Sequence, residues 1–253
     1  MAKLKKKVDL ANENGMLFSE FGTRRRLNYD VQDKVCAYLK EHSKTCVGTS
    51  NVHFAMKYGM KPIGTHPHEW FMFHGAQYGY KAANYMALEN WVDIYDGDLG
   101  IALSDTYTSD VFFRSFSLKQ AKLFDGVRQD SGDEYKFTDK TIDFYKGRGI
   151  DYHSKTIVFS NALDFPKALK ILKYCREKGI KCSFGIGTNL TCDVYAPDGT
   201  KYDAENIVMK MSRCRMNSKQ PWYLTIKISD DLGKHMGDPR EIEIAKYELH
   251  LDE

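Results

Sequence analysis

The sequence predicts an α/β fold in which parallel strands alternate with helices, as in a (β/α) barrel. From Cys46 onward a short apolar run is repeatedly followed by small or acidic residues and then by an amphipathic stretch. Strands that alternate with helices pair in parallel, and barrel strands carry their chemistry at their carboxyl ends. A Rossmann sheet is the competing architecture, but GIGTNL comes late in the chain and breaks the G-x-G-x-x-G pattern.

Six apolar runs are expected to be strands. They are Cys46–Val47, Pro62–Ile63, Leu99–Leu103, Gly126–Arg128, Thr156–Phe159 and Lys181–Ile186. Among the segments between them, Asp164–Lys178 has the residue spacing of an amphipathic helix, and Gly179 is a suitable C-cap. Six units are too few to close a standard eight-stranded barrel, so we expect the barrel to be incomplete.

The two ends of the chain depart from this pattern. Met1–Glu20 predicts a helix with nothing before it to connect, which suggests a chain that begins within a domain. Asn206–Met211 and Tyr223–Ile228 predict two further strands, for which a separate antiparallel hairpin is one arrangement. We therefore expect one barrel domain over residues 1–253, with βα units in about 21–193 and a small extension of strands and a helix in 194–253.

Composition excludes several classes of protein. Hydrophobic residues at 42% and charged residues at 28% are typical of a globular chain, and a formal net charge of +3 provides no strong field for binding nucleic acid. No apolar run approaches the roughly 20 residues that a membrane-spanning helix needs. Six cysteines without a C-x-x-C pair indicate reduced thiols, so we expect a cytoplasmic protein that binds neither membrane nor nucleic acid.

The densest candidate cluster is GTHPHEW, which begins at Gly64. Pro67 suits the first position of a helix, and Glu69 complements the positive helix end. His68 would then lie in the first turn, where the helix dipole lowers its pKa and keeps the imidazole neutral and nucleophilic. The alternative is a histidine that only hydrogen-bonds neighbouring strand ends.

The same cluster also permits a metal site. His66, His68 and His74 lie close in sequence, but a histidine-based site needs further ligands from later strand ends. The later histidines fall in loops or in the tail, at His153, His235 and His250. We therefore expect no metal ion that the protein binds tightly.

A second cluster begins at Asp125 and reads DGVRQDSGD. On a strand, Arg128 and Asp130 point to the same face, where the arginine could bind a carboxylate in bidentate fashion. Asp130 could meet ribose hydroxyls or a bound Mg²⁺. An internal Arg–Asp ion pair is the alternative, although the Ser-Gly-Asp that follows argues for function.

Two further segments could bind phosphate. Gly185 and Gly187 would let backbone N–H groups approach an oxyanion after a late strand, although turns need glycine in any case. Arg24, Arg25 and Arg26 form a basic stretch that is either solvated or holds a pyrophosphate.

Read in order, FGTRRR, VGTSN, GTHPHEW, ALSDTYTSD, VRQDSGD, VFSNALD and SFGIGTNLTCDV resemble successive motifs of the nicotinate phosphoribosyltransferases, particularly the bacterial type. The resemblance runs from Phe18 to the tail. It implies the irregular TIM-like barrel of a type II phosphoribosyltransferase. Members of that family begin with a further N-terminal region, which supplies an aromatic residue that stacks on nicotinate, typically across a dimer interface.

The resemblance also implies the reaction. Nicotinate and phosphoribosyl pyrophosphate would give nicotinate mononucleotide and pyrophosphate, in NAD biosynthesis, by a homodimer that uses Mg²⁺ and ATP. The ATP would act through a phosphorylated histidine, which by motif position is His68. Thr65 would lie beside nicotinate and Arg128 would bind its carboxylate, while Asp130 would be a ribose- or magnesium-side carboxylate. The remaining substrate-binding positions would be Arg24, Ser50, Ser160, Asn161, Gly185, Gly187 and Thr188.

The sequence departs from the family pattern in three places. Gln129 stands where histidine is frequent, and Asn161 stands where an aspartate is common. Tyr195–Glu205 replaces a usual Lys-Pro-Leu before Asn206. Two alternatives therefore stay open: a truncated family member without catalysis, and a metal-dependent barrel hydrolase that uses His66 and His68.

Overall fold

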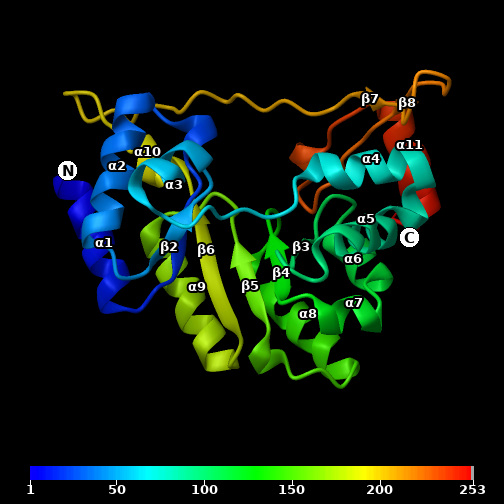
Figure 1. The fold of residues 1–253 in the computed structure, drawn as a ribbon, viewed down its shortest axis with the longest axis horizontal. Coiled ribbons are helices and arrows are strands. Elements are labelled where there is room, and N and C mark those ends of the chain that lie inside the picture. Colours follow the sequence, from blue (N-terminus) through cyan, green and yellow to red (C-terminus); the bar gives the residue numbers. More distant parts are fainter. Residues whose placement is uncertain (252–253) are drawn as a thin grey trace. The chain divides into compact units, whose positions relative to one another are not determined.

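The computed structural model describes residues 1–251 and has an α/β fold built on a six-stranded parallel sheet (Figure 1). The strand order is β2-β1-β6-β5-β4-β3. Because β2 and β3 stand at the two edges, and each pairs with one neighbouring strand only, the described strands form no closed barrel, and the expected TIM-like barrel is not confirmed. The strands are β1 (Phe18–Glu20), β2 (Cys46–Thr49), β3 (Ile101–Leu103), β4 (Gly126–Gln129), β5 (Thr156–Phe159) and β6 (Lys181–Ile186).

Five of the six expected strands are confirmed, and one is wrong. Pro62 forms only an isolated parallel bridge with Thr49, because a single pair of hydrogen bonds joins this segment to β2. The missed strand is β1, which the sequence placed at the end of a helix. That helix, α1 (Ala2–Glu13), stops before Gly15, whose φ of +57° is unfavourable for a residue with a side chain.

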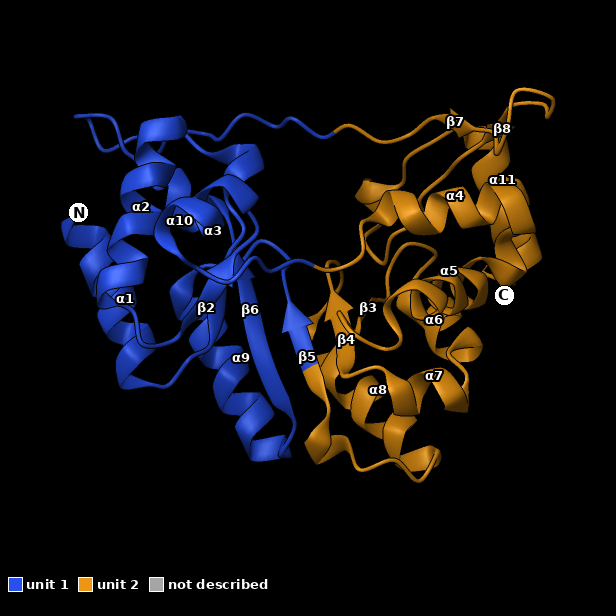
Figure 2. Ribbon diagram, in the orientation of Figure 1, with its two compact units in different colours: residues 1–64, 157–208 blue, residues 65–156, 209–253 orange. Residues whose placement is uncertain are grey.

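The chain forms two compact units (Figure 2). Unit 1 consists of Met1–Gly64 and Ile157–Val208, and unit 2 consists of Thr65–Thr156 and Met209–Glu253. Each unit is thus assembled from two separate stretches of sequence. Within residues 1–251, no helix is both long enough and apolar enough to cross a membrane.

Unit 1 holds β1 between β2 and β6, with parallel pairing on both sides. Its amphipathic helix α9 (Phe165–Lys178) contacts β6 and confirms the expected helix. Asp164 caps the start by accepting from the Lys167 N–H, and Gly179 ends the helix with φ of +79°. The other helices are α1, η1 (Thr23–Arg25), α2 (Tyr29–His42), α3 (Val52–Tyr58) and α10 (Thr188–Thr191).

Unit 2 surrounds the parallel pair β3 and β4. Its helices are α4 (His68–Tyr78), α5 (Tyr80–Tyr95), α6 (Ser109–Ser115), α7 (Leu118–Leu123), α8 (Glu134–Gly147), η2 (Tyr152–Ser154), η3 (Leu232–Lys234) and α11 (Pro239–Leu249). A small antiparallel hairpin pairs β7 (Arg213–Cys214) with β8 (Tyr223–Leu224). The expected strand at Asn206–Met211 is wrong, because pairing begins only at Arg213.

The tail after β8 is not separate from the rest of unit 2. Ile228 forms a parallel bridge with Tyr107, in the loop that follows β3. The Ile228 N–H donates to the Thr106 carbonyl at 2.7 Å, and the Thr108 N–H donates to the Ile228 carbonyl at 3.1 Å. The segment from Thr225 to Ser229 is buried throughout, so it is a structural part of this unit.

His66 belongs to the aromatic core of unit 2. Its side chain is fully buried, and its ring lies 4.2 Å from that of Trp91, with Phe71 and Phe124 also in contact. Its Nδ1–H donates to the Ile101 carbonyl at 2.9 Å. Burial lowers the pKa of His66 to about 4, so the imidazole is neutral at pH 7.

The close contact at Gly126 generates a stability prediction. A Cβ atom at this position would lie 1.8 Å from the Thr156 carbonyl oxygen, and backbone cannot move aside as a flexible side chain can. We expect Gly126→Ala to lower the free energy of unfolding by at least about 1–3 kcal/mol, measured by urea unfolding. Gly147→Ala is the matched control, because no atom lies within 4 Å of its Cβ position. Equal stability of the two variants would contradict the close contact between Gly126 and the Thr156 carbonyl.

His66 generates a pH prediction. Its folded pKa of about 4 lies below the unfolded value near 6.5, so the stabilisation is complete above about pH 6.5 and is lost as the pH falls towards 4. This shift corresponds to roughly 3 kcal/mol. We expect the unfolding free energy of the native chain to fall more between pH 7 and pH 4.5 than that of His66→Gln. Parallel pH profiles would show that His66 does not titrate as described.

Candidate active site

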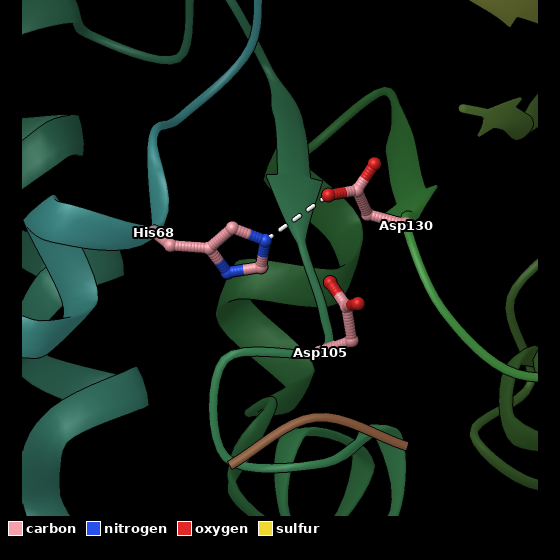
Figure 3. A group of neighbouring side chains, drawn as sticks. All are labelled: His68, Asp105 and Asp130. Atoms are coloured by element: carbon pink, nitrogen blue, oxygen red, sulfur yellow. Dashed lines mark hydrogen bonds and ion pairs between the residues drawn. The ribbon is translucent and has the colours of Figure 1, made fainter. Parts of the chain in front are cut away.

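Two carboxylates lie side by side because of the register between β3 and β4. Leu103 pairs with Arg128, and Asp105 and Asp130 each follow two residues later, so both side chains extend from the same edge of the parallel pair. His68 reaches this point from α4 (Figure 3). The three residues each offer one atom within 4.8 Å of the others. A helix start and two strand ends thus converge on one group, which we call the His68 cluster.

His68 is the first residue of α4. Pro67 is the N-cap and not the first helical residue, one position from the expectation, but His68 does lie in the first turn. Its Nε2 lies 3.2 Å from Asp130 Oδ2, and its Nδ1 lies 3.0 Å from Thr106 Oγ1. Because a carboxylate only accepts, Nε2–H donates to Asp130 and the Thr106 hydroxyl donates to Nδ1. These hydrogen bonds to strand-end residues are the ones that a purely structural histidine would also make.

The pKa of His68 is lowered, as the sequence predicted, but the main cause is different. Burial is the largest contribution, since the charged imidazolium would lose its hydration. The Asp130 hydrogen bond and the charge of Asp105 raise the pKa and oppose this effect, while the charge of Lys227 lowers the pKa further. The balance favours a neutral imidazole beside two carboxylates.

Asp105 is the functional candidate that the sequence missed. Its side chain is fully buried, and Ser131 Oγ donates a hydrogen bond to Oδ2. Oδ1 has no hydrogen-bond partner among residues 1–251. A buried carboxylate oxygen without a donor is costly, which marks this position as one that a ligand could complete. The only signal in the sequence was its place in SDT, directly after a strand.

Arg128 and Asp130 share a face, as expected. Arg128 Nη2 lies 3.0 Å from Asp130 Oδ1, and Nη1 donates to Thr65 Oγ1 at 2.8 Å. The ion pair that was the structural alternative is therefore present. It is partly exposed, because 17% of the arginine side chain and 25% of the aspartate side chain remain accessible.

The residues around this pair have structural roles that the sequence argument did not anticipate. Ser131 bonds Asp105, Gly132 turns the chain with φ of +78°, and Asp133 caps α8 by accepting from a backbone N–H. Gln129 is buried and donates to the carbonyls of Ser131 and Gly132, at 2.8 and 2.9 Å. Ser-Gly-Asp therefore has structural uses of its own, and its presence is weaker support for function than the sequence suggested.

The histidines of the metal alternative do not converge. His66 is in the aromatic core, and His74 bonds the Trp70 carbonyl and the Asn90 amide. The His68 cluster has ligand types that could hold a cation. Arg128 already pairs with Asp130, however, and Lys227 acts electrostatically on both carboxylates. Two positive side chains therefore balance two negative ones, which disfavours tight binding of a metal ion by the protein alone.

In unit 1, the FGTRRR and GIGTN segments lie against each other. The Phe21 N–H donates to the Ile186 carbonyl at 2.9 Å, and Thr191 Oγ1 donates to the Gly22 carbonyl at 3.1 Å. A Cβ at Gly185 would meet the Phe21 ring at 2.6 Å, and one at Gly187 would meet the Phe21 carbonyl oxygen at 2.8 Å. Glycine is therefore required here by close packing.

Glu20 fixes the shape of this part of unit 1. Its fully buried carboxylate accepts from the Gly22 N–H at 2.5 Å, from Thr49 Oγ1 at 2.6 Å and from Gln32 Nε2 at 3.0 Å. Its carbonyl accepts from the Ser50 N–H at 2.9 Å. One carboxylate therefore links the loop after β1 to the end of β2.

The predicted site residues thus fall into two groups. Unit 2 brings together Thr65, His68, Arg128 and Asp130. Unit 1 holds the rest at the carboxyl ends of its strands. Arg24 and Ser50 are exposed and follow β1 and β2; Ser160 and Asn161 follow β5; Gly185 is within β6, and Gly187 and Thr188 follow it.

Comparison with known proteins identifies the family of the chain. The model of the nicotinate phosphoribosyltransferase (NAPRTase) family matches residues 16–253. The nicotinate phosphoribosyltransferase of Chromohalobacter salexigens is 52% identical over 97% of this chain and 61% of its own length. That of Methanosarcina mazei is 47% identical over 93% of this chain and 55% of its own.

The crystal structure of nicotinate phosphoribosyltransferase from Porphyromonas gingivalis has the same fold. It matches with a TM-score of 0.93 and 48% identity, over 98% of this chain and 62% of that one. The chain spans less than two thirds of the length of each of these three proteins. The chain belongs to the nicotinate phosphoribosyltransferase family.

Proposed function

We propose that this chain carries the catalytic residues of a nicotinate phosphoribosyltransferase. The reaction joins nicotinate to the ribose of phosphoribosyl pyrophosphate, releases pyrophosphate and serves NAD biosynthesis. The observation that carries the proposal is His68, a buried and neutral imidazole at a helix start, hydrogen-bonded to Thr106 and Asp130. The names of the relatives support the same activity.

His68 is the proposed phosphate acceptor from ATP. Nδ1, the ring nitrogen that carries the lone pair, gives up its hydrogen bond from Thr106 and bonds the γ-phosphorus, while the bond between that phosphorus and the β,γ-bridging oxygen breaks and ADP leaves with that electron pair. The Nε2 proton passes to Asp130, which already accepts its hydrogen bond. The start of α4 then stabilises the anionic phosphoryl group, because backbone N–H groups and the helix dipole favour negative charge there.

Arg128 is the proposed anchor for the nicotinate carboxylate, with Thr65 beside it. The two side chains are already joined at 2.8 Å, so the guanidinium is oriented before substrate binds. It is also partly accessible, as a substrate contact must be. Asp130 bonds the other nitrogen of the guanidinium, so it orients Arg128 in addition to accepting the hydrogen bond from His68.

The unit 1 residues are the proposed phosphate and ribose contacts. Gly187 and Thr188 would receive the 5′-phosphate together with Gly185, and Arg24 would contact substrate phosphates. Ser50, Ser160 and Asn161 would contact the same substrate. All of these residues lie at or just after the carboxyl ends of parallel strands, where α/β enzymes bind ligands. As part of this proposal, the open sheet belongs to the irregular (β/α) barrel of the type II phosphoribosyltransferases.

Mg²⁺ is expected to arrive with the substrate phosphates, whose charge it would neutralise. Asp105 is a suitable ligand for Mg²⁺, because its Oδ1 is a buried carboxylate oxygen that has no hydrogen-bond partner among the described residues. Magnesium typically takes one or two carboxylates and completes its shell with phosphate and water. Such a phosphate-bound Mg²⁺ is compatible with the His68 cluster, in which Arg128 and Lys227 already balance the two carboxylates.

The working enzyme is further proposed to be a cytoplasmic homodimer. Its six cysteines are unpaired, which fits a reducing compartment. The hydrolase alternative is not favoured, because His66 and His74 are occupied in the core. A non-catalytic role is also not favoured, since the His68 cluster is assembled.

The first test of this function is His68 itself. We expect the chain, by itself or with the N-terminal region of its family supplied separately, to form nicotinate mononucleotide and to incorporate acid-labile phosphate from γ-labelled ATP. His68→Ala should abolish incorporation and ATP coupling, and leave at most a slow transfer without ATP, whereas His66→Gln should retain the label. If the label persisted in His68→Ala and vanished in His66→Gln, ATP would phosphorylate His66 and not His68, and the proposal would be contradicted.

The second test is the carboxylate preference of Arg128. A charge-assisted hydrogen bond contributes ~1.5–3 kcal/mol, so Arg128→Ala should weaken nicotinate binding about tenfold to a hundredfold. Nicotinamide lacks the carboxylate and should lose much less. Arg148→Ala, an exposed arginine on the same unit, is the control. Equal losses for both ligands in Arg128→Ala would indicate a purely structural ion pair.

A further inference from the structure

A buried lysine in the tail acts electrostatically on the His68 cluster and has no assigned role beyond this balance of charge. Lys227 lies in the buried segment from Thr225 to Ser229, and only 6% of it is exposed. Its backbone is held by two hydrogen bonds with Met236, at 2.8 and 2.9 Å. The next residue, Ile228, is bonded to the loop that contains Asp105 and Thr106. Lys227 therefore has a fixed position beside the cluster.

The same segment is also tied to the loop after β4. The Asp230 N–H donates to Ser131 Oγ at 3.3 Å, and Asp231 Oδ1 accepts from the Gly132 N–H at 3.1 Å. Both loops that carry the carboxylates are thus joined by the residues around Lys227. Its charge is near enough to act on Asp105, Asp130 and His68 alike.

Lys227 differs from the other lysines near it. Lys210 pairs with Glu69 at 3.0 Å, and Lys234 pairs with Asp231 at 2.7 Å. The Lys227 ammonium makes no hydrogen bond or ion pair with any residue of 1–251. A lysine kept only to neutralise Asp105 or Asp130 would pair with it directly, since a buried unpaired charge is costly. Its burial lowers its pKa, and the two carboxylates act to raise it.

We propose that Lys227 binds the phosphoryl group that is transferred to His68, and that it is a catalytic residue of this chain. The inference rests on the proposed phosphorylation of His68. An incoming phosphoryl group carries negative charge towards two carboxylates, and a cation that is already beside them offsets this repulsion. An ammonium that has no protein partner can donate its hydrogen bonds to phosphate oxygens without first breaking an ion pair.

The test uses the 253-residue chain and two probes, inorganic phosphate and γ-labelled ATP. Phosphate binding is followed through the NMR signals of the His68 imidazole, and transfer through acid-labile label. We expect Lys227→Met to weaken phosphate binding about tenfold to a hundredfold and to lower phosphohistidine yield in proportion. Lys227→Arg should recover part of both, because it restores a cation.

Lys234→Met is the matched control, since that lysine is 43% exposed and already paired with Asp231. It should leave phosphate binding within about twofold of the native chain, below the roughly 1.4 kcal/mol of a tenfold change. If Lys227→Met does not melt cooperatively, Lys227→Gln replaces it, because its amide can bond the neighbouring carboxylates.

The outcomes separate the two proposals. Native affinity for phosphate in Lys227→Met or Lys227→Gln, or no phosphate binding by the native chain, would overturn the role of Lys227. If the native chain binds phosphate, the variants lose it and no label reaches His68, the anion site stands and the phosphotransfer proposal fails.

Discussion

The candidate site depends on the parallel pairing of β3 with β4. That register places Asp105 and Asp130 at equal distances beyond the paired residues Leu103 and Arg128. Two carboxylates this close repel each other, and the repulsion is stronger where water is excluded. The surrounding residues therefore have to compensate: Arg128 pairs with Asp130, and Ser131 donates to Asp105.

His68 occupies the space that this arrangement creates. Its imidazole is in contact with a carboxylate that would favour the charged form, but burial has the larger effect and favours the neutral form. The imidazole of His68 is therefore neutral, so one of its two ring nitrogens carries a lone pair and no proton. The helix start was expected to be the main cause, yet in a buried site the loss of hydration outweighs a dipole effect that is typically 0.3–1 kcal/mol at exposed helix ends.

Glycine has different uses in the two units. Gly185 and Gly187 are required because Phe21 and its carbonyl approach too closely for a Cβ, whereas Gly132 is required by its positive φ. A phosphate-binding loop needs the same residue for a third reason, close approach of the backbone to an oxyanion. The sequence pattern alone cannot distinguish these three causes, because each leaves the same glycine.

The sequence by itself determined the α/β class, five of the strands, the helix from Phe165 and the place of His68 in a first helical turn. These follow from local periodicity and capping, which neighbouring residues decide. It also determined that Arg128 and Asp130 share a face, since alternation along a strand is local. Only the tertiary structure decided that β1 is a strand, because three residues become a strand only when β2 and β6 pair with them. It likewise brought Asp105, Thr106 and Lys227 to His68, since contacts across about 40 to 160 residues depend on strand register and on where the tail packs, which no local pattern encodes.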